Sequence, residues 1–125
     1  MRPTTIDHVC LLVTNLNEAK AYFERLFDFI CTPVKNDTPT LAIESEAVHF
    51  FISESTTAPP DFLRQQHISF TVDALQPIIE QLASQKIPFK TGQFNAFKYR
   101  NYKWCEWRGP DGIRLECAEI VNAAD

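Results

Sequence analysis

Polar and apolar residues alternate in two similar stretches of the chain. In residues 5–15, the period-two rule places Val9, Leu11 and Val13 on one face of a predicted strand, and places His8 on the other with Ile6, Cys10 and Leu12. Residues 65–73 repeat this alternation, with His67 on the polar face. Each histidine lies five residues before a valine, and each stretch is followed by a helical pattern. The repeat predicts that one half of the chain is a copy of the other.

The remaining pattern predicts the same elements in both halves. Asn15 and Glu18 fit a capping box for a helix that ends near Asp28, and Asp73 is the predicted cap of a second helix. Strand-like runs follow at residues 29–34, 39–44 and 47–53 in the first half, and at 87–91, 102–108 and 113–120 in the second. Residues 92–100 are less regular and are predicted to hold a loop.

This order of elements predicts an α+β fold of two tandem βαβββ modules. The modules comprise residues 1–53 and 65–121, and a linker at 54–64, with Ser, Thr and two adjacent prolines, joins them. A single ferredoxin-like βαββαβ domain is the alternative, but it leaves two predicted strands unexplained.

Composition narrows the classes of function. The chain has 125 residues and a net charge of -4, without a long run of either sign, which argues against a nucleic-acid partner. No apolar run reaches transmembrane length, and the N-terminus lacks a signal-peptide pattern, so we expect a cytoplasmic protein without a membrane partner. The four cysteines form no C-x-x-C pair and are expected to be small buried hydrophobes: Cys10, Cys31, Cys105 and Cys117.

Three motifs resemble those of the vicinal oxygen chelate superfamily. That superfamily includes glyoxalase I, fosfomycin-resistance transferases, extradiol dioxygenases and bleomycin-resistance proteins. The motifs are Ile6-Asp7-His8-Val9 with segments 13–16 and 21–27, then His67-Ile68-Ser69-Phe70, and finally Gly109-Pro110-Asp111-Gly112 with residues 113–116. In that superfamily two βαβββ modules close into a half-barrel cup, so the resemblance implies a glyoxalase-like fold over nearly the whole chain.

The resemblance also implies a divalent metal in the cup. Carried over by position, the metal ligands are His8, His67 and Glu116. Two imidazoles and a carboxylate with open coordination positions suit Fe, Mn, Zn or Ni. Many relatives build each cup from two chains, so a homodimer and a small-molecule substrate are expected.

Several positions depart from the best-known activities. Aligning the repeats places Phe50 opposite Glu116, where the glyoxalase I pattern has a carboxylate, which counts against ordinary glyoxalase I chemistry. His49 is predicted on the opposite face, in a structural role, unless a bulge turns it inward. Glu106 stands where extradiol dioxygenases have a tyrosine, and Cys10 stands where fosfomycin transferases have a threonine.

Other side chains are candidates for contact with the substrate. Glu106 and Tyr102 are the candidate catalytic groups, with Glu106 as a general acid or base or, alternatively, as an ion-pair partner of Arg108 or Arg114. The candidate substrate-binding residues are Phe50, Arg100, Trp104 and Arg114. The basic and aromatic segment 98–103, which includes Lys98, could grip an anionic group or form a solvated loop.

These observations favour a metal-dependent enzyme that acts on a small, oxygen-chelating substrate. A second hypothesis is a metal-free module that sequesters a drug or planar ligand, with Trp104, Phe50 and Phe94 stacked on it. A third is a structural dimerisation domain, which leaves the repeated histidines unexplained.

Overall fold

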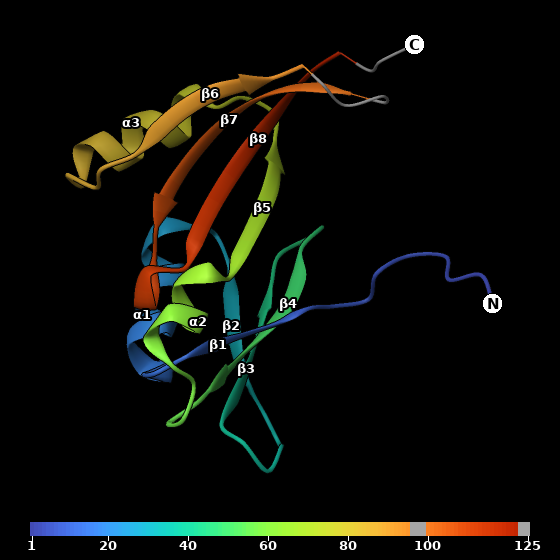
Figure 1. The fold of residues 1–125 in the computed structure, drawn as a ribbon, viewed down its shortest axis with the longest axis vertical. Helices are drawn as coiled ribbons and strands as arrows, with labels where there is room; N and C mark the ends of the chain where they lie inside the picture. The colour runs from blue at the N-terminus through green and yellow to red at the C-terminus, as the bar shows by residue number, and fades with distance from the viewer. Residues whose placement is uncertain (96–99, 123–125) are drawn as a thin grey trace. The chain divides into compact units, whose positions relative to one another are not determined.

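The computed structural model describes residues 1–95 and 100–122 (Figure 1). The chain forms two compact units, residues 1–63 and 64–125, and each unit is built on its own four-stranded sheet. Among the described residues, no helix is both long and apolar enough to cross a membrane.

Unit 1 has the predicted βαβββ order. Its elements are β1 (Cys10–Val13), α1 (Leu16–Leu26), β2 (Ile30–Val34), β3 (Thr40–Glu44) and β4 (His49–Glu54). The strand order is β1-β4-β3-β2, with β1 parallel to β4 and the other pairs antiparallel.

Unit 2 repeats this topology. Its elements are β5 (His67–Val72), α3 (Gln76–Ser84), β6 (Lys90–Phe94), β7 (Asn101–Arg108), the 3-10 turn η1 (Pro110–Gly112) and β8 (Arg114–Asn122). The strand order β5-β8-β7-β6 matches that of unit 1, and β5 is again parallel to β8. The predicted fold of two tandem βαβββ modules is confirmed.

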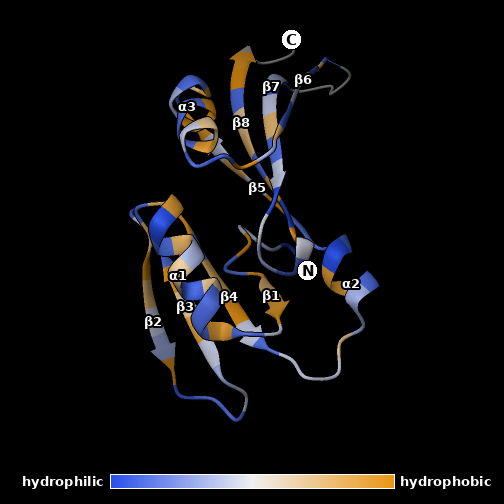
Figure 2. Cartoon of the chain, turned by 90° about the vertical axis from the view of Figure 1, so that its left-hand side faces the viewer, coloured by the Kyte–Doolittle hydropathy of each residue, from blue (hydrophilic) through white to orange (hydrophobic). Residues whose placement is uncertain are grey.

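One face of each sheet forms the core with the helix of its unit. In unit 1, Phe23 of α1 lies between the sheet and the helix with its ring 5.8 Å from that of Phe50, and both side chains are fully buried. Orange and blue segments alternate along α1, as an amphipathic helix on a sheet requires (Figure 2). In unit 2, Leu82 of α3 and the buried residues Trp107, Leu115 and Cys117 provide the core. The opposite face of each sheet carries one histidine of the repeat, His8 in unit 1 and His67 in unit 2.

A carboxylate from the last strand caps the helix of each unit. Glu54 Oε2 accepts from Leu16 N at 3.0 Å, and Glu119 Oε1 accepts from Leu75 N at 2.9 Å. The predicted cap Asn15 is confirmed, because its side chain accepts from Glu18 N at 3.0 Å. The predicted cap Asp73 is wrong: α3 begins after Leu75, without a side-chain cap from its own segment.

Other boundaries differ from the prediction by a few residues. The first strand is shorter than residues 5–15, so His8 precedes β1. The predicted linker contains a short helix, α2 (Pro60–Gln65). The strand expected at 87–91 is β6, which extends to Phe94 into the region predicted as a loop.

Candidate functional site

His67 and Glu116 lie side by side on the open face of the unit 2 sheet. His67 begins β5, and two residues later Ser69 pairs with Glu116 of β8. Because alternate residues share a face, both side chains point away from α3. His67 Nε2 lies 3.9 Å from Glu116 Oε1, which is too long for a hydrogen bond.

The separation of these two atoms fits a shared metal ion. Nitrogen and oxygen ligands lie about 2.0–2.2 Å from a divalent metal, so two ligands of one ion are roughly 3–4 Å apart. Glu116 is only 8% exposed, and a carboxylate so deeply buried requires a positively charged partner. A cation between Nε2 and Oε1 would meet that requirement.

Arg114 sets the protonation pattern of His67 in this structure. Its Nη2 lies 3.2 Å from His67 Nδ1, and a guanidinium can only donate, so Nδ1 is the acceptor. The neutral imidazole then carries its hydrogen on Nε2, the atom that a metal would need as a lone-pair donor. Metal binding at Nε2 therefore requires the hydrogen to move to Nδ1 and Arg114 to turn away.

Glu106 gives Arg114 a second anchor. Glu106 pairs with Glu116 across β7 and β8, and its Oε2 lies 3.2 Å from Arg114 Nε. That N–H is buried and points at no acceptor among the described residues, so the attraction is between charges and is not a directed hydrogen bond. This ion pair agrees with the alternative that the sequence left open for Glu106.

In unit 1, His8 has the opposite hydrogen-bond arrangement. Its Nδ1 lies 2.8 Å from Asp7 Oδ2, and since the carboxylate accepts, Nδ1 carries the hydrogen. The hydrogen bond from His8 lowers the pKa of Asp7 below its usual value. Nε2 of His8 is left with a lone pair, which is how a carboxylate prepares a histidine to bind a metal.

The sequence predicted His49 on the face opposite His8, and this prediction is wrong. His49 lies beside His8. The two rings are 6.2 Å apart, and ligand atoms of Asp7, His8 and His49 all lie within 4.8 Å of one another. Phe51 completes this surface, with its ring 4.6 Å from His8 and 5.1 Å from His49. Unit 1 thus presents two imidazoles and a carboxylate together.

The alignment of Phe50 with Glu116 is wrong by one residue. Two residues after His8, Cys10 pairs with Phe51, just as Ser69 pairs with Glu116. Phe51 therefore matches Glu116. Phe50 is 1% exposed and packs on the helix side of the sheet, which leaves Phe51 to line the open face.

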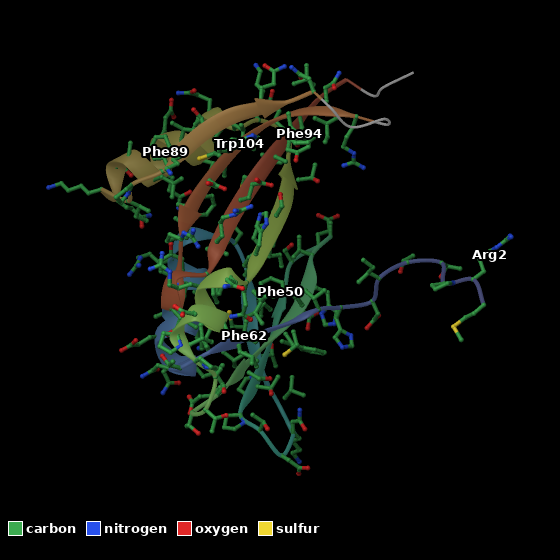
Figure 3. The ribbon with its side chains drawn as sticks, in the orientation of Figure 1. Arg2, Phe50, Phe62, Phe89, Phe94 and Trp104 are labelled. Carbon is green, nitrogen blue, oxygen red and sulfur yellow. The ribbon has the colours of Figure 1, made fainter. Side chains whose placement is uncertain are left out.

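The aromatic candidates of unit 2 share the face of Glu116. Trp104 pairs with Ala118 and lies over Gly92, where an added Cβ would collide with the indole. The rings of Phe94 and Tyr102 stack 5.6 Å apart, and Figure 3 shows Phe94 and Trp104 along the same sheet. The other tryptophan, Trp107, is in the core.

The remaining candidates are less informative. Arg100 is exposed just before β7, whereas Lys98 lies outside the described residues. Cys10 is exposed, with its Sγ 3.4 Å from Ser53 Oγ, so it is not the buried filler that was expected. Burial raises the pKa of Cys105 to about 11 and that of Cys117 to about 12, so these thiols stay protonated and inert.

Sequence reasoning missed several residues of these surfaces. Asp7 precedes His8 in the first motif, and this adjacency is the sequence signal for its contact with the histidine. Arg64 was assigned to a linker, and Arg108 was considered only as a partner of Glu106. Their proximity to His67 depends on how α2 and η1 fold, which periodicity does not report.

Comparisons with known proteins agree with the topology. The family described as "Glyoxalase/Bleomycin resistance protein/Dioxygenase superfamily" has a sequence profile that matches residues 5–117. No protein of the curated set matches the chain.

Solved structures share the fold at low sequence identity. A virulence protein from Salmonella typhimurium matches with a TM-score of 0.77 and 16% identity, over 97% of this chain and 100% of that chain. The fosfomycin resistance protein FosX from Listeria monocytogenes matches with a TM-score of 0.73 and 13% identity, over 96% of this chain and 94% of that chain. TnmS3, an antibiotic binding protein from Streptomyces sp. CB03234, matches with a TM-score of 0.74 and 11% identity, over 97% of this chain and 99% of that chain. At these identities the similarity establishes the fold alone.

Proposed function

The chain belongs to the Glyoxalase/Bleomycin resistance protein/Dioxygenase superfamily, and from this premise we propose that it is a metal-dependent enzyme for a small, oxygen-chelating substrate. The observation that carries the proposal is the pair formed by His67 Nε2 and buried Glu116 Oε1, 3.9 Å apart on an open sheet face. A relative supports it: a FosX variant has been crystallised with Mn(II) and a dihydroxypropylphosphonic acid.

We propose that His8 joins His67 and Glu116 as the third ligand of Fe, Mn, Zn or Ni. The Asp7 hydrogen bond supports this role, because it leaves Nε2 of His8 available. His49 is a candidate fourth ligand from the same unit. A bound divalent cation would polarise adjacent substrate oxygens and stabilise negative charge that develops on them.

The neighbouring side chains would then act on the substrate. Glu106 is the proposed general acid or base, since it pairs directly with Glu116 across the strands. Tyr102 and Trp104 lie on the same face and would position a planar group, while Arg114 would orient an anionic one.

Metal analysis of the purified protein tests this proposal. Protein prepared without chelator and supplied in turn with Mn, Fe, Zn and Ni should retain one equivalent of at least one metal. His67→Ala and Glu116→Gln should each lower that affinity by about a hundredfold, since a missing ligand costs several kcal/mol. Lys20→Ala, an exposed change on α1, is the matched control. Equal metal retention by all variants would refute the assignment.

The second candidate function is metal-free sequestration of a planar ligand. The stacked Phe94 and Tyr102 rings and the adjacent Trp104 favour it, and TnmS3 is described as an antibiotic binding protein. Failure to retain any metal, together with quenching of Trp104 fluorescence by a planar drug, would favour this function over the enzyme.

A further inference from the structure

Unit 2 contains a pocket that its candidate metal ligands do not explain. The cavity has a volume of about 490 Å³ and lies where β7 ends and β8 begins. Four cationic side chains line it: Arg64, Lys90, Arg108 and Arg114. Glu106 is the single carboxylate among the lining residues, so the lining is strongly positive, although the whole chain has a net charge of -4.

Arg108 is held in place without being neutralised. Its Nη1 donates to the carbonyl oxygens of Arg64 at 2.9 Å and Gly112 at 3.0 Å. Carbonyl oxygens carry no net charge, so these bonds orient the guanidinium and leave its positive charge available. An anion that binds there would meet a donor that is already ordered, which reduces the entropic cost of binding.

The η1 turn places Arg64 at the pocket. Gly112 has a φ of 75°, and a Cβ at that position would come within 3.0 Å of Arg64 Cγ. The absence of a side chain at Gly112 therefore lets the stem of Arg64 cross the turn. Arg64 and Arg108 are thus positioned by the same short segment, the closing Gly-Pro-Asp-Gly motif.

Another wall of the pocket is apolar, and the arginines of the pocket also line a cavity that contains His67. Ile87, Pro88 and Phe89 come from the segment before β6, and Phe89 is labelled there in Figure 3. A second cavity, of about 390 Å³, is lined by Arg64, Arg108 and Arg114 together with His67. A ligand in the pocket would therefore lie close to the candidate metal ligand.

We propose that this pocket binds the anionic head group, a carboxylate or a phosphoryl group, of a small molecule with an apolar body. The proposal deepens the proposed function, because it gives the substrate class, and it rests on that function only for the identification of the ligand as a substrate. The arginines would bind the head group, and the apolar wall would cover the body.

Calorimetry on protein stripped of metal with a chelator, and then dialysed free of that chelator, tests the pocket separately from the metal. The probes are phenylphosphonate, benzoate, inorganic phosphate and, as a neutral control, benzyl alcohol. We expect phenylphosphonate or benzoate to bind saturably, inorganic phosphate to bind more weakly, and benzyl alcohol not to bind. Which of the two acids binds more tightly identifies the head group.

Arg64→Gln is the decisive variant, because it keeps most of the stem over Gly112 and removes the charge. Binding should weaken about tenfold or more, as expected for a lost charge-assisted hydrogen bond. Arg25→Gln, on α1 and beside the Tyr22 ring, is the matched control. Arg108→Gln should weaken binding similarly, with thermal unfolding recorded for each variant.

Two results would overturn the proposal: equal loss of affinity in Arg25→Gln and Arg64→Gln, or no saturable binding of either acid. Equal affinity for phosphate and phenylphosphonate would contradict the part of the proposal that assigns an apolar body to the ligand. The calorimetry uses metal-free protein, so its outcome does not depend on the metal analysis. If the protein retains no metal but binds the acids, the proposed metal-dependent activity is refuted and the proposed anion pocket stands.

Discussion

The contact between Arg114 and His67 links the two parts of the unit 2 site. The guanidinium holds the hydrogen of His67 on Nε2, and its charge lies next to the place where a cation would bind. Arg114, which already contacts Glu106, therefore opposes metal binding until its Nη2 leaves His67 for a bound anion. An anionic substrate would then bind more tightly when the metal is present, because both draw on the same movement.

Arg114→Met should release this constraint. The methionine removes the donor and the charge, so the hydrogen of His67 should move toward Nδ1 and metal affinity should rise about fivefold, roughly 1 kcal/mol. Nitrogen-15 NMR of the imidazole and a competitive metal titration measure the two effects. Arg108→Met removes an equal charge without contact to His67, and an identical effect there would show that only charge matters.

At the scale of elements, each module depends on its last strand in two ways. β4 and β8 each lie between the first and third strands of their module, and each supplies the carboxylate that caps the helix. A carboxylate near a helix N-terminus binds an unpaired N–H and interacts favourably with the helix dipole. Glu54 and Glu119 thus connect each helix to the last strand of its module, which is an inner strand of the sheet.

Replacement of Glu119 by alanine should destabilise the protein by about 1–2 kcal/mol, since a charge-assisted cap is lost. Glu54→Ala should have a similar effect on unit 1. Urea unfolding followed by circular dichroism measures both. Glu80→Ala, on the exposed side of α3, should change the free energy of unfolding by less than about 0.5 kcal/mol, and a cost equal to that of Glu119→Ala would contradict the cap.

The sequence predicts elements better than their faces. Alternation identified the strands and the duplication, because His8 and His67 mark the same position in each copy. It failed at β4, where Phe50 and Phe51 are both apolar and periodicity cannot decide which is buried. Phe50 is the buried residue because it packs against Phe23. By alternation, His49 and Phe51 then lie on the opposite face, beside His8.

The caps and the pocket were beyond the reach of sequence patterns for a related reason. Asp73 had the right residue type for a local cap, but Glu119 reaches the same N-terminus from a strand 44 residues away along the chain. Arg64 and Arg108 are likewise 44 residues apart and meet through a backbone carbonyl. Contacts of such separation depend on tertiary structure, which no local periodicity encodes.

At the scale of the whole molecule, the proposed metal site combines ligands from both units. We propose a homodimer, in which a cup could be completed within one chain or by unit 1 of one chain and unit 2 of the other. Co-expression of a His8→Ala chain with a His67→Ala chain tests this. If the cups are shared between chains, one cup of the purified heterodimer would carry both substitutions and the other would carry neither. The heterodimer should then retain one metal ion, whereas each homodimeric variant should bind metal about a hundredfold more weakly.

Light scattering of the same samples gives the oligomeric state, and a homodimer has twice the mass of the 14.4 kDa chain. A monomeric protein, or a heterodimer without metal, would indicate that each chain completes its own site. Neither outcome affects the anion pocket, because all of its lining residues belong to unit 2.

The central position of β4 in its sheet has a consequence for synthesis on the ribosome. The nascent chain cannot assemble the first module until Glu54 has left the exit tunnel, since β1 and β3 both pair with β4 and α1 takes its cap from that residue. Once Glu54 has emerged, every strand of this module is available while the rest is still being translated. Vectorial folding would thus bring His8 and His49 together before the second half of the protein has left the tunnel.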